Sequence, residues 1–374
     1  MRRLGKCAII LLLMVEALGV CGTIRAAQTR EWIVGVNVVN PTRASVADQN
    51  AIIDELKAAH VRVIRAPVPP DDKGIDFIER VYAAGVKIEL QVSPQYPPNA
   101  PTRAYQPDVF PNMWGGHPLS YADAELSRVY FQNFLEELEA KGIVLAGLEL
   151  GNEINWTAFN AEFPLPGKGI NFGLQDLYRD PEGMQIAKGY LQYLKILAAL
   201  KDVRDHSILN RQTPIILVGL ADDGAEGLRP NSKTDSVSIN ATIEFLRANG
   251  LDKLVDDYGI HTYPWEKTAA RREMHLEKYA VAECHPMNAT GGKPCWITEW
   301  GISNKDMSCP LNDDARAAMV RETMDDFREL EKQGRLVGAM YFAWNSDPWA
   351  KKADPLSVYR CGALTEGGKL ALSP

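Results

Sequence analysis

The chain has 374 residues, of which 24% are charged and 46% are apolar, which is typical of a globular protein and excludes a low-complexity or disordered chain. The formal net charge of −7 makes nucleic acid and anionic lipid poor partners, because both are negatively charged. This length suits either two small domains or one large barrel.

The first 27 residues have the features of a secretory signal peptide. Arg2, Arg3 and Lys6 form a basic start, and an apolar run follows over 8–20. The run is too short and too interrupted to span a membrane. We therefore expect cleavage near Ala27, a secreted or periplasmic protein, and no membrane association of the mature form. Lipidation at Cys21 and a buried N-terminal strand are the alternatives.

Removal of residues 1–27 leaves a more acidic chain, which suits a neutral ligand such as a sugar without requiring one. It also leaves an even number of cysteines, which in an exported chain predicts disulfides. We expect the pairs Cys284–Cys295 and Cys309–Cys361, the second of which ties the C-terminal tail to the rest of the chain. A zinc site and free buried thiols are the alternatives, but no C-x-x-C spacing supports zinc.

Short apolar runs alternate with longer amphipathic stretches along the chain, a pattern typical of βα units. The expected strands are Trp32–Val38, Val61–Arg65, Lys87–Val92, Val144–Leu150, Ile215–Leu220, Tyr258–His261, Trp296–Glu299 and Gly338–Ala343. Eight strands separated by helices predict the α/β class and a single (β/α)8 TIM barrel over 28–374. A doubly wound sheet also alternates, but no G-x-G-x-x-G follows the first strand.

Helix boundaries follow from capping residues and glycines. Ser45 is expected to cap a helix that buries Ile52, Ile53, Leu56 and Ala59. Ser120 is expected to cap a second helix with Leu126, Val129, Phe134, Leu135 and Leu138 inward. Further helices are expected over 184–204, 236–247 and 313–332, with a short last helix over 369–372. Gly142, Gly250 and Gly334 are expected to end helices.

Long segments over 93–119 and 156–183 follow the third and fourth strands and are rich in proline, glycine and aromatic residues. In a (β/α)8 barrel these loops lie on the catalytic face, where the carboxyl ends of the strands meet. We therefore expect them to form the walls of a substrate cleft.

Two carboxylates end predicted strands on that face. Glu153 follows the fourth strand and Glu299 ends the seventh. Cleavage of a glycosidic bond needs two such groups, one as acid/base and one as nucleophile, and a separation of about 5 Å predicts retention of configuration. Burial is expected to raise the pKa of Glu153, and hydrogen-bond donors such as Arg65 and Tyr263 are expected to keep Glu299 ionised.

The string LELGNEINW around Glu153, followed later by WITEWG around Glu299, resembles the large clan A of β-glycosidases on (β/α)8 barrels. The resemblance spans most of residues 32–345 and assigns the clan but no single family. It implies that Glu153 is the general acid/base and Glu299 the nucleophile. It also implies that Asn152 binds the 2-hydroxyl of the sugar at the cleavage point.

Further roles implied by the resemblance concern the walls of the same pocket. Arg65 and Tyr263 hold Glu299, and His261 lines the pocket. Trp344 is the hydrophobic platform beneath the sugar, because flat aromatic rings stack on the weakly apolar faces of pyranoses. Trp300 beside the nucleophile and Gln91 near the end of the third strand are further substrate-binding candidates.

Several polar and aromatic residues have a structural alternative. Glu149 is interpreted as structural, and Asn37 is a pocket candidate that is equally compatible with a core role. His117 either reaches the cleft from the third loop or is simply solvated. Loop packing and a sugar subsite are both open for four tryptophans, Trp114, Trp156, Trp265 and Trp349.

The sequence thus predicts a retaining glycoside hydrolase that acts on a β-linked oligo- or polysaccharide. A catalytically inactive carbohydrate-binding barrel and a transglycosylase with the same two glutamates are the alternatives. No H-x-H, H-E-x-x-H or G-x-S-x-G motif occurs, so no metal site, no cofactor and no esterase chemistry are expected. We expect a monomer with a carbohydrate substrate.

Overall fold

The computed structural model describes residues 31–111, 113–222, 233–264, 268–287, 291–306, 308–345 and 354–373. The predicted signal peptide lies outside these residues, as do Trp265 and Trp349. The interpretations that concern them therefore stay predictions.

The strands form one parallel sheet in the order β6-β4-β3-β2-β1-β11-β10-β9-β7. Its two edge strands, β6 and β7, are the two halves of the single strand predicted over 215–220. Leu217 lies between the two halves and donates its N–H to the carbonyl of Asp257, which precedes β9. The two edges of the sheet are therefore joined, and the predicted eight-stranded (β/α)8 barrel is confirmed.

The predicted strands agree with the structure to within a few residues. The observed barrel strands are β1 (Ile33–Asn37), β2 (Val63–Pro67), β3 (Lys87–Val92), β4 (Gly147–Leu150), β6 (Ile215–Ile216), β7 (Leu220–Ala221), β9 (Tyr258–Thr262), β10 (Cys295–Trp300) and β11 (Leu336–Tyr341). All of them pair in parallel, as the alternation with helices requires.

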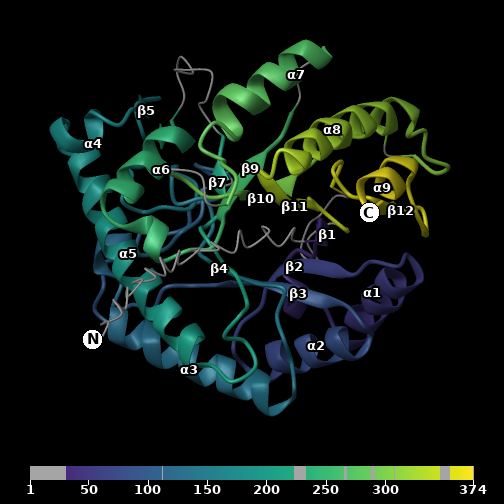
Figure 1. Cartoon of the computed structure of the whole chain (residues 1–374), viewed down its shortest axis with the longest axis horizontal. Coiled ribbons are helices and arrows are strands. Elements are labelled where there is room, and N and C mark those ends of the chain that lie inside the picture. The colour runs from purple at the N-terminus through teal and green to yellow at the C-terminus, as the bar shows by residue number, and fades with distance from the viewer. Residues whose placement is uncertain are drawn as a thin grey trace, which may run out of the picture. The chain divides into compact units, whose positions relative to one another are not determined.

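Helices lie around the barrel strands, as Figure 1 shows. The main ones are α1 (Val46–Ala58), α2 (Asp72–Ala83), α3 (Ala124–Ala140), α5 (Pro181–His206), α6 (Ile239–Ala248), α7 (Ala269–His275), α8 (Asp314–Lys332) and α9 (Glu366–Ala371). Gly142, Gly250 and Gly334 follow α3, α6 and α8 with φ values of 73°, 102° and 74°, so the predicted helix ends are confirmed. In the described part of the chain, no helix is both long and apolar enough to cross a membrane.

Of the two predicted helix caps, one is right and one is wrong. The hydroxyl of Ser45 accepts from the N–H of Asp48 at the start of α1, as predicted. The second helix, α3, is capped by Asp123 instead of Ser120, because the Asp123 carboxylate accepts from two N–H groups of the first turn. As a result Leu126 and Val129 face solvent, at 43% and 49% exposure.

Short elements complete the fold. Sheets of two strands pair β5 (Asn171–Phe172) with β8 (Ser236–Val237), and β12 (Tyr359–Arg360) with β13 (Ala363–Leu364). The remaining elements are α4 (Asp176–Arg179), the 3-10 helices Pro41–Arg43, Leu119–Tyr121 and Leu251–Lys253, and a π-helical turn at Leu276–Ala280. The β5–β8 pair joins the segment after β4 to the segment that leads into α6.

The barrel has two separate hydrophobic cores. The larger one includes the inward faces of the helices and the outward faces of the strands. The smaller one contains Val63, Ile216, Trp296 and Met340, from strands β2, β6, β10 and β11. Strands that are not neighbours contact one another only through the barrel interior, so these four side chains lie inside the barrel.

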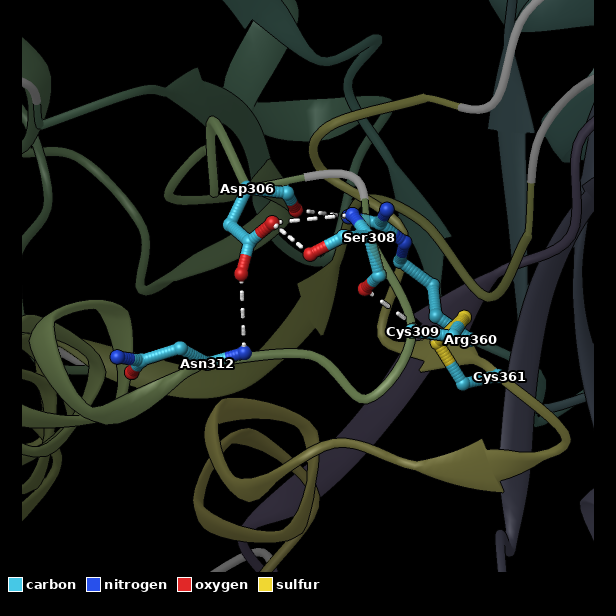
Figure 2. Close-up of a disulfide and its surroundings, with 6 residues drawn as sticks. All are labelled: Asp306, Ser308, Cys309, Asn312, Arg360 and Cys361. Carbon is cyan, nitrogen blue, oxygen red and sulfur yellow. Dashed lines mark hydrogen bonds between the residues drawn. A yellow bond between two sulfur atoms is a disulfide. The ribbon is translucent and has the colours of Figure 1, made fainter.

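Both predicted disulfides are present, Cys284–Cys295 and Cys309–Cys361. Figure 2 shows the second one, which joins the segment after β10 to the β12–β13 hairpin. Next to it, the carboxylate of Asp306 accepts from the backbone and hydroxyl of Ser308 and from the N–H of Asn312. These hydrogen bonds lower the pKa of Asp306.

Candidate active site

Glu299 reaches the barrel interior because β10 contains a bulge. Ile297 pairs with Ile260 and Glu299 with His261, so Thr298 is one extra residue between them. In a regular strand that buries Trp296 inside the barrel, residue 299 points outward, and one inserted residue reverses this. The bulge therefore directs the Glu299 carboxylate into the barrel.

The Glu299 carboxylate has a hydrogen-bond donor on each oxygen. Arg65, in β2, donates Nη1–H to Oε1 at 2.6 Å, and the hydroxyl of Tyr263, just after β9, donates to Oε2 at 2.6 Å. A cation and a phenol at these distances favour the ionised carboxylate. The predicted contacts of Arg65 and Tyr263 with Glu299 are thus present in the structure.

Glu153 follows β4 in a left-handed backbone conformation, with φ of 43°, and its N–H donates to the carbonyl of Gly219. His261 Nδ1 lies 2.8 Å from Glu153 Oε1, and the indole N–H of Trp156 donates to Oε2 at 2.8 Å. The turn after β4 therefore presents Glu153 to His261 and Trp156, whereas Glu299 has a cation and a phenol. The two carboxylates have different partners although both are buried.

Gly219, between β6 and β7, makes room for His261. A Cβ at this position would lie 2.0 Å from His261 Nε2 and 2.5 Å from Thr298 Oγ1. Only glycine therefore allows the imidazole to reach Glu153 from β9. This close approach coincides with the break between the two halves of the fifth barrel strand.

Glu153, His261 and Glu299 each offer one atom within 4.8 Å of the others. This proximity is also compatible with a bound metal ion. However, all four carboxylate oxygens already have a hydrogen-bonding partner, and the Arg65 cation lies against Glu299. A fixed cation at 2.6 Å from the same carboxylate disfavours a second cation, so the arrangement fits a proton-transferring carboxylate pair better than a metal centre.

Burial and neighbouring charges shift the proton affinities of this cluster. Burial raises the pKa of Glu153, and the charge of Glu299 adds to this, whereas the hydrogen bond from His261 opposes it. Burial alone lowers the pKa of His261, but the charges of Glu299 and Glu153 outweigh it and raise the value. Burial and the charge of Glu299 raise the pKa of Tyr263 well above its usual range, so this phenol stays a donor.

A layer of buried charge lies beneath the two carboxylates. Glu149, in β4, binds Arg65 with both oxygens at 2.5 and 3.1 Å, and it also accepts from the N–H of Gly219. Glu89, in β3, lies 3.5 Å from Arg65 and is fully buried. These contacts agree with the interpretation of Glu149 as structural, because Glu149 holds the guanidinium of Arg65 that contacts Glu299.

Three further predicted residues lie around this cluster. The carboxamide oxygen of Asn152 accepts from Arg65 Nη2 at 3.1 Å. Gln91 is partly exposed and donates to the carbonyl of Gly151, whereas Asn37 is buried and donates to carbonyls of β10 and β11. Asn37 also accepts from Arg65, which makes it part of the scaffold and not of a pocket surface.

The prediction that Trp344 forms the platform beneath a sugar is wrong. Its ring is fully buried, stacks on Tyr359 at 5.0 Å and donates to Glu55 of α1, so no face of it is open. Trp300 is also not available for substrate, because it is fully buried edge-on against Phe327 of α8 and Tyr341. Both indoles point away from the barrel interior into the helical layer.

Phe342 is the aromatic residue that the sequence interpretation missed. It follows β11 directly, is partly exposed, and lies edge-on to the ring of Tyr263 at 6.3 Å. Tyr263 in turn bonds to Glu299, so Phe342 is one ring removed from this carboxylate. The only signal in the sequence was its place at the end of the last strand, two residues before the more conspicuous Trp344.

The loops after β3 and β4 hold the remaining candidates. Trp156 bonds to Glu153, and Trp114 is 40% exposed. His117 Nδ1 lies 2.8 Å from the carbonyl oxygen of Pro101 and 3.1 Å from the hydroxyl of Thr102, and the His117 ring packs on that of Tyr96 at 4.7 Å. His117 is therefore held within its own loop and does not join the carboxylate cluster.

The fold and the site together define a (β/α)8 barrel with two buried carboxylates at the carboxyl ends of β4 and β10. No model of a known protein family matches the chain, and no curated protein matches it. Solved structures do match, and those with TM-scores of at least 0.50 include enzymes that act on several different glycosides.

A structure of fungal β-1,4-galactanases matches with a TM-score of 0.52 and 14% identity, over 92% of this chain and 98% of that one. The catalytic domain of xylanase C from Talaromyces cellulolyticus matches with a TM-score of 0.50 and 10% identity, over 92% and 77%. A β-glucosidase from Thermotoga maritima matches with a TM-score of 0.50 and 11% identity, over 92% and 97%. The predicted resemblance to clan A glycoside hydrolases is thus confirmed for the fold.

Proposed function

We propose that the protein is a retaining glycoside hydrolase that cleaves a β-linked oligo- or polysaccharide, with Glu299 as nucleophile and Glu153 as general acid/base. One observation carries this proposal. Oxygens of the two carboxylates lie within 4.8 Å of each other, and retaining enzymes place their carboxyl groups about 5 Å apart. An inverting enzyme needs a wider gap, because a water molecule stands between its carboxylate and the sugar.

In the first step, Glu153 donates its proton to the glycosidic oxygen while a Glu299 oxygen attacks the anomeric carbon. The bond to the leaving group breaks, and an ester forms between the sugar and Glu299. In the second step, Glu153 removes a proton from water, whose oxygen attacks the same carbon. The ester breaks, the sugar leaves with its original configuration, and both glutamates regain their starting states.

The proton affinities of the site support this division of roles. The raised pKa of Glu153, caused first by burial, favours its protonated form. Arg65 and Tyr263 donate hydrogen bonds to the two oxygens of Glu299, the carboxylate that attacks. The different contacts of the two carboxylates suit a general acid and a nucleophile.

Substrate contacts follow from the groups around the pair. Asn152 uses its carboxamide oxygen toward Arg65, so its NH2 group is the part that remains to donate to a sugar hydroxyl. Phe342 provides the aromatic face next to the nucleophile, in place of Trp344. Two disulfides and the predicted signal peptide support action outside the cytoplasm.

The test is a comparison of the mature chain over 28–374 with its Glu299→Ala variant on β-linked polysaccharides and aryl β-glycosides. We expect turnover to fall by several orders of magnitude in the variant. Asp257→Asn is the matched control, because Asp257 is also a buried acid but precedes β9 and bonds to Trp296 at the other end of the barrel. Near-wild-type turnover by Glu299→Ala contradicts the assignment.

Three further readouts separate the alternatives. The configuration of the first product, followed by proton NMR, is expected to match that of the substrate, and inversion excludes Glu299 as nucleophile. Transfer products at high acceptor concentration identify a transglycosylase. Tight sugar binding without any cleavage over long incubation identifies an inactive carbohydrate-binding barrel.

A further inference from the structure

A row of aromatic rings extends over the catalytic face from Glu153. Trp156, which bonds to Glu153, lies 6.3 Å from Phe159, and Phe159 lies 6.5 Å from Trp114. Trp114 stacks on Tyr105 at 5.2 Å. We refer to Trp156, Phe159, Trp114 and Tyr105 as the aromatic row.

The outer rings of this row are open to solvent. Phe159, Trp114 and Tyr105 are 41%, 40% and 48% exposed. Large aromatic rings that only pack a loop gain most of their stabilisation by burial, so adjacent exposed rings indicate a contact surface.

The loop that carries the outer part of the row is rigidly attached to the next one. Arg103 donates from Nη2 to the carbonyls of Trp114 and Thr157, at 2.8 and 2.7 Å, and from Nη1 to that of Asn160. In addition, the N–H of Trp114 donates to the carbonyl of Ala158. One guanidinium thus joins the loop after β3 to the loop after β4, which fixes the rings in place before any ligand arrives.

The row is on the side of Glu153 and not of Glu299. The nucleophile has Tyr263 and Phe342 as its aromatic neighbours, whereas the row begins at the indole that bonds to the acid. A general acid protonates the oxygen that links the sugar at the cleavage point to the leaving group. The leaving-group part of a substrate therefore lies on the side of Glu153, where the row begins.

We propose that the aromatic row binds the leaving-group part of a glycan chain, so that the preferred substrate is an oligo- or polysaccharide and not a glycoside with a small leaving group. The chemistry fits, because the C–H faces of pyranose rings stack on flat aromatic side chains. A row of rigid, exposed rings that begins beside Glu153 suits a stiff chain of sugars. This inference rests on the proposed function, because the row gains its direction from Glu153.

The experiment compares the wild type with Trp114→Ala and Phe159→Ala on two kinds of substrate. The first kind is a series of β-1,4-linked galactose, mannose, xylose and glucose oligosaccharides, from disaccharide to hexasaccharide. The second is an aryl β-glycoside of the same sugar. Tyr121→Ala is the matched control, because Tyr121 is 49% exposed but lies outside the row.

We expect kcat/KM of the wild type to rise with chain length, and each row variant to lose about tenfold on the longer chains. Activity on the aryl glycoside is expected to stay unchanged in the row variants. A merely structural role of these rings lowers both activities together, and that result overturns the inference. An equal gain with chain length in the wild type and both row variants also overturns it, while the proposed function stands.

Binding gives an independent readout if the wild type cleaves nothing, in which case the proposed hydrolysis itself fails. Titration calorimetry with the hexasaccharides is then run on the wild type and on Trp114→Ala. Binding that weakens about tenfold in the variant supports the row as a glycan site. Absence of binding to every hexasaccharide, or equal affinity in both proteins, overturns it.

Discussion

Two buried glutamates next to the same arginine are expected to differ in how much stability they lose on the same substitution. Glu149 and Glu89 are both fully buried, on neighbouring strands, and both lie near Arg65. Glu149 contacts the guanidinium at 2.5 Å with two hydrogen bonds, whereas Glu89 lies 3.5 Å away. Glutamine has the shape of glutamate without the charge, so it tests charge alone.

Removing one partner of a buried ion pair costs about 3–5 kcal/mol, because the other charge stays buried without compensation. In Glu149→Gln, the contact of Arg65 with Glu299 at 2.6 Å remains and limits this cost. We therefore expect a loss of about 3 kcal/mol in the free energy of unfolding. Activity is expected to fall about 100-fold, because Arg65 is no longer held in position against the nucleophile.

Glu89 has a raised pKa, caused first by burial and then by the charge of Glu149, which favours its neutral, protonated form. Glutamine mimics this neutral form, and Glu89→Gln is expected to change the free energy of unfolding by less than about 1.5 kcal/mol. The sign depends on pH. Above the unfolded-state pKa of about 4.3 the unfolded chain ionises Glu89 and the folded chain does not, so the wild type loses stability as pH rises. The variant is expected to avoid this loss.

The pKa of Glu149 lies below its usual value, because the charge and hydrogen bonds of Arg65 outweigh the effect of burial. Its stabilisation is therefore complete above the unfolded-state pKa and is lost as pH falls through the lower folded-state value. Urea unfolding of the wild type and both variants between about pH 3 and 8 measures these differences, with the Glu149 contribution lost at the acidic end and the Glu89 contribution changing above about pH 4.3. Equal destabilisation by Glu149→Gln and Glu89→Gln, or a stability of Glu89→Gln that falls with pH as in the wild type, refutes the reasoning.

Two other predictions concern the acid and the disulfides. Because burial raises the pKa of Glu153, kcat/KM is expected to fall as pH rises through this pKa. If Glu153→Gln shows the same fall of kcat/KM at high pH as the wild type, Glu153 is not the general acid. Replacing Cys309 and Cys361 by serine is expected to cost about 4 kcal/mol of unfolding free energy, and replacing Cys284 and Cys295 about 3 kcal/mol, because the sequence separations are 52 and 11. Denaturant unfolding checks that loss of the Cys309–Cys361 disulfide costs more than loss of Cys284–Cys295. If the Cys284–Cys295 disulfide contributes more, loop closure is not the main source of the stabilisation.

Much of the architecture followed from local patterns. The segment predicted as a strand over 87–92, in which polar and apolar residues alternate, is β3 residue for residue, and the glycines after α3, α6 and α8 have the left-handed backbone that ends helices. These signals are local, since apolar periodicity and glycine act within a few residues. The cap of α3 was misassigned because Ser120 and Asp123 both suit a cap, and only the hydrogen bonds decide between them.

Side-chain direction at the strand ends was much less predictable. Trp344 and Trp300 stand beside the expected site in the sequence, yet both indoles pack into the helical layer. Phe342, two residues before Trp344, instead lies edge-on to Tyr263. Because neighbouring residues of a strand face opposite sides, Glu299 and Trp300 lie on opposite sides of β10, and residue type alone does not decide which of the two enters the barrel.

The sequence by itself determined the order of strands and helices and the two carboxylates, because each depends on residue type and on position along the chain. It favoured one pairing of the cysteines among several, and the structure shows that pairing. Only the tertiary structure decided which side chains meet at the barrel mouth. The bulge at Thr298 directs Glu299 inward, and Arg65 reaches it across 234 residues of sequence. Neither contact has a local signature, since a bulge changes direction through one extra residue and a closed barrel joins residues that are far apart in the chain.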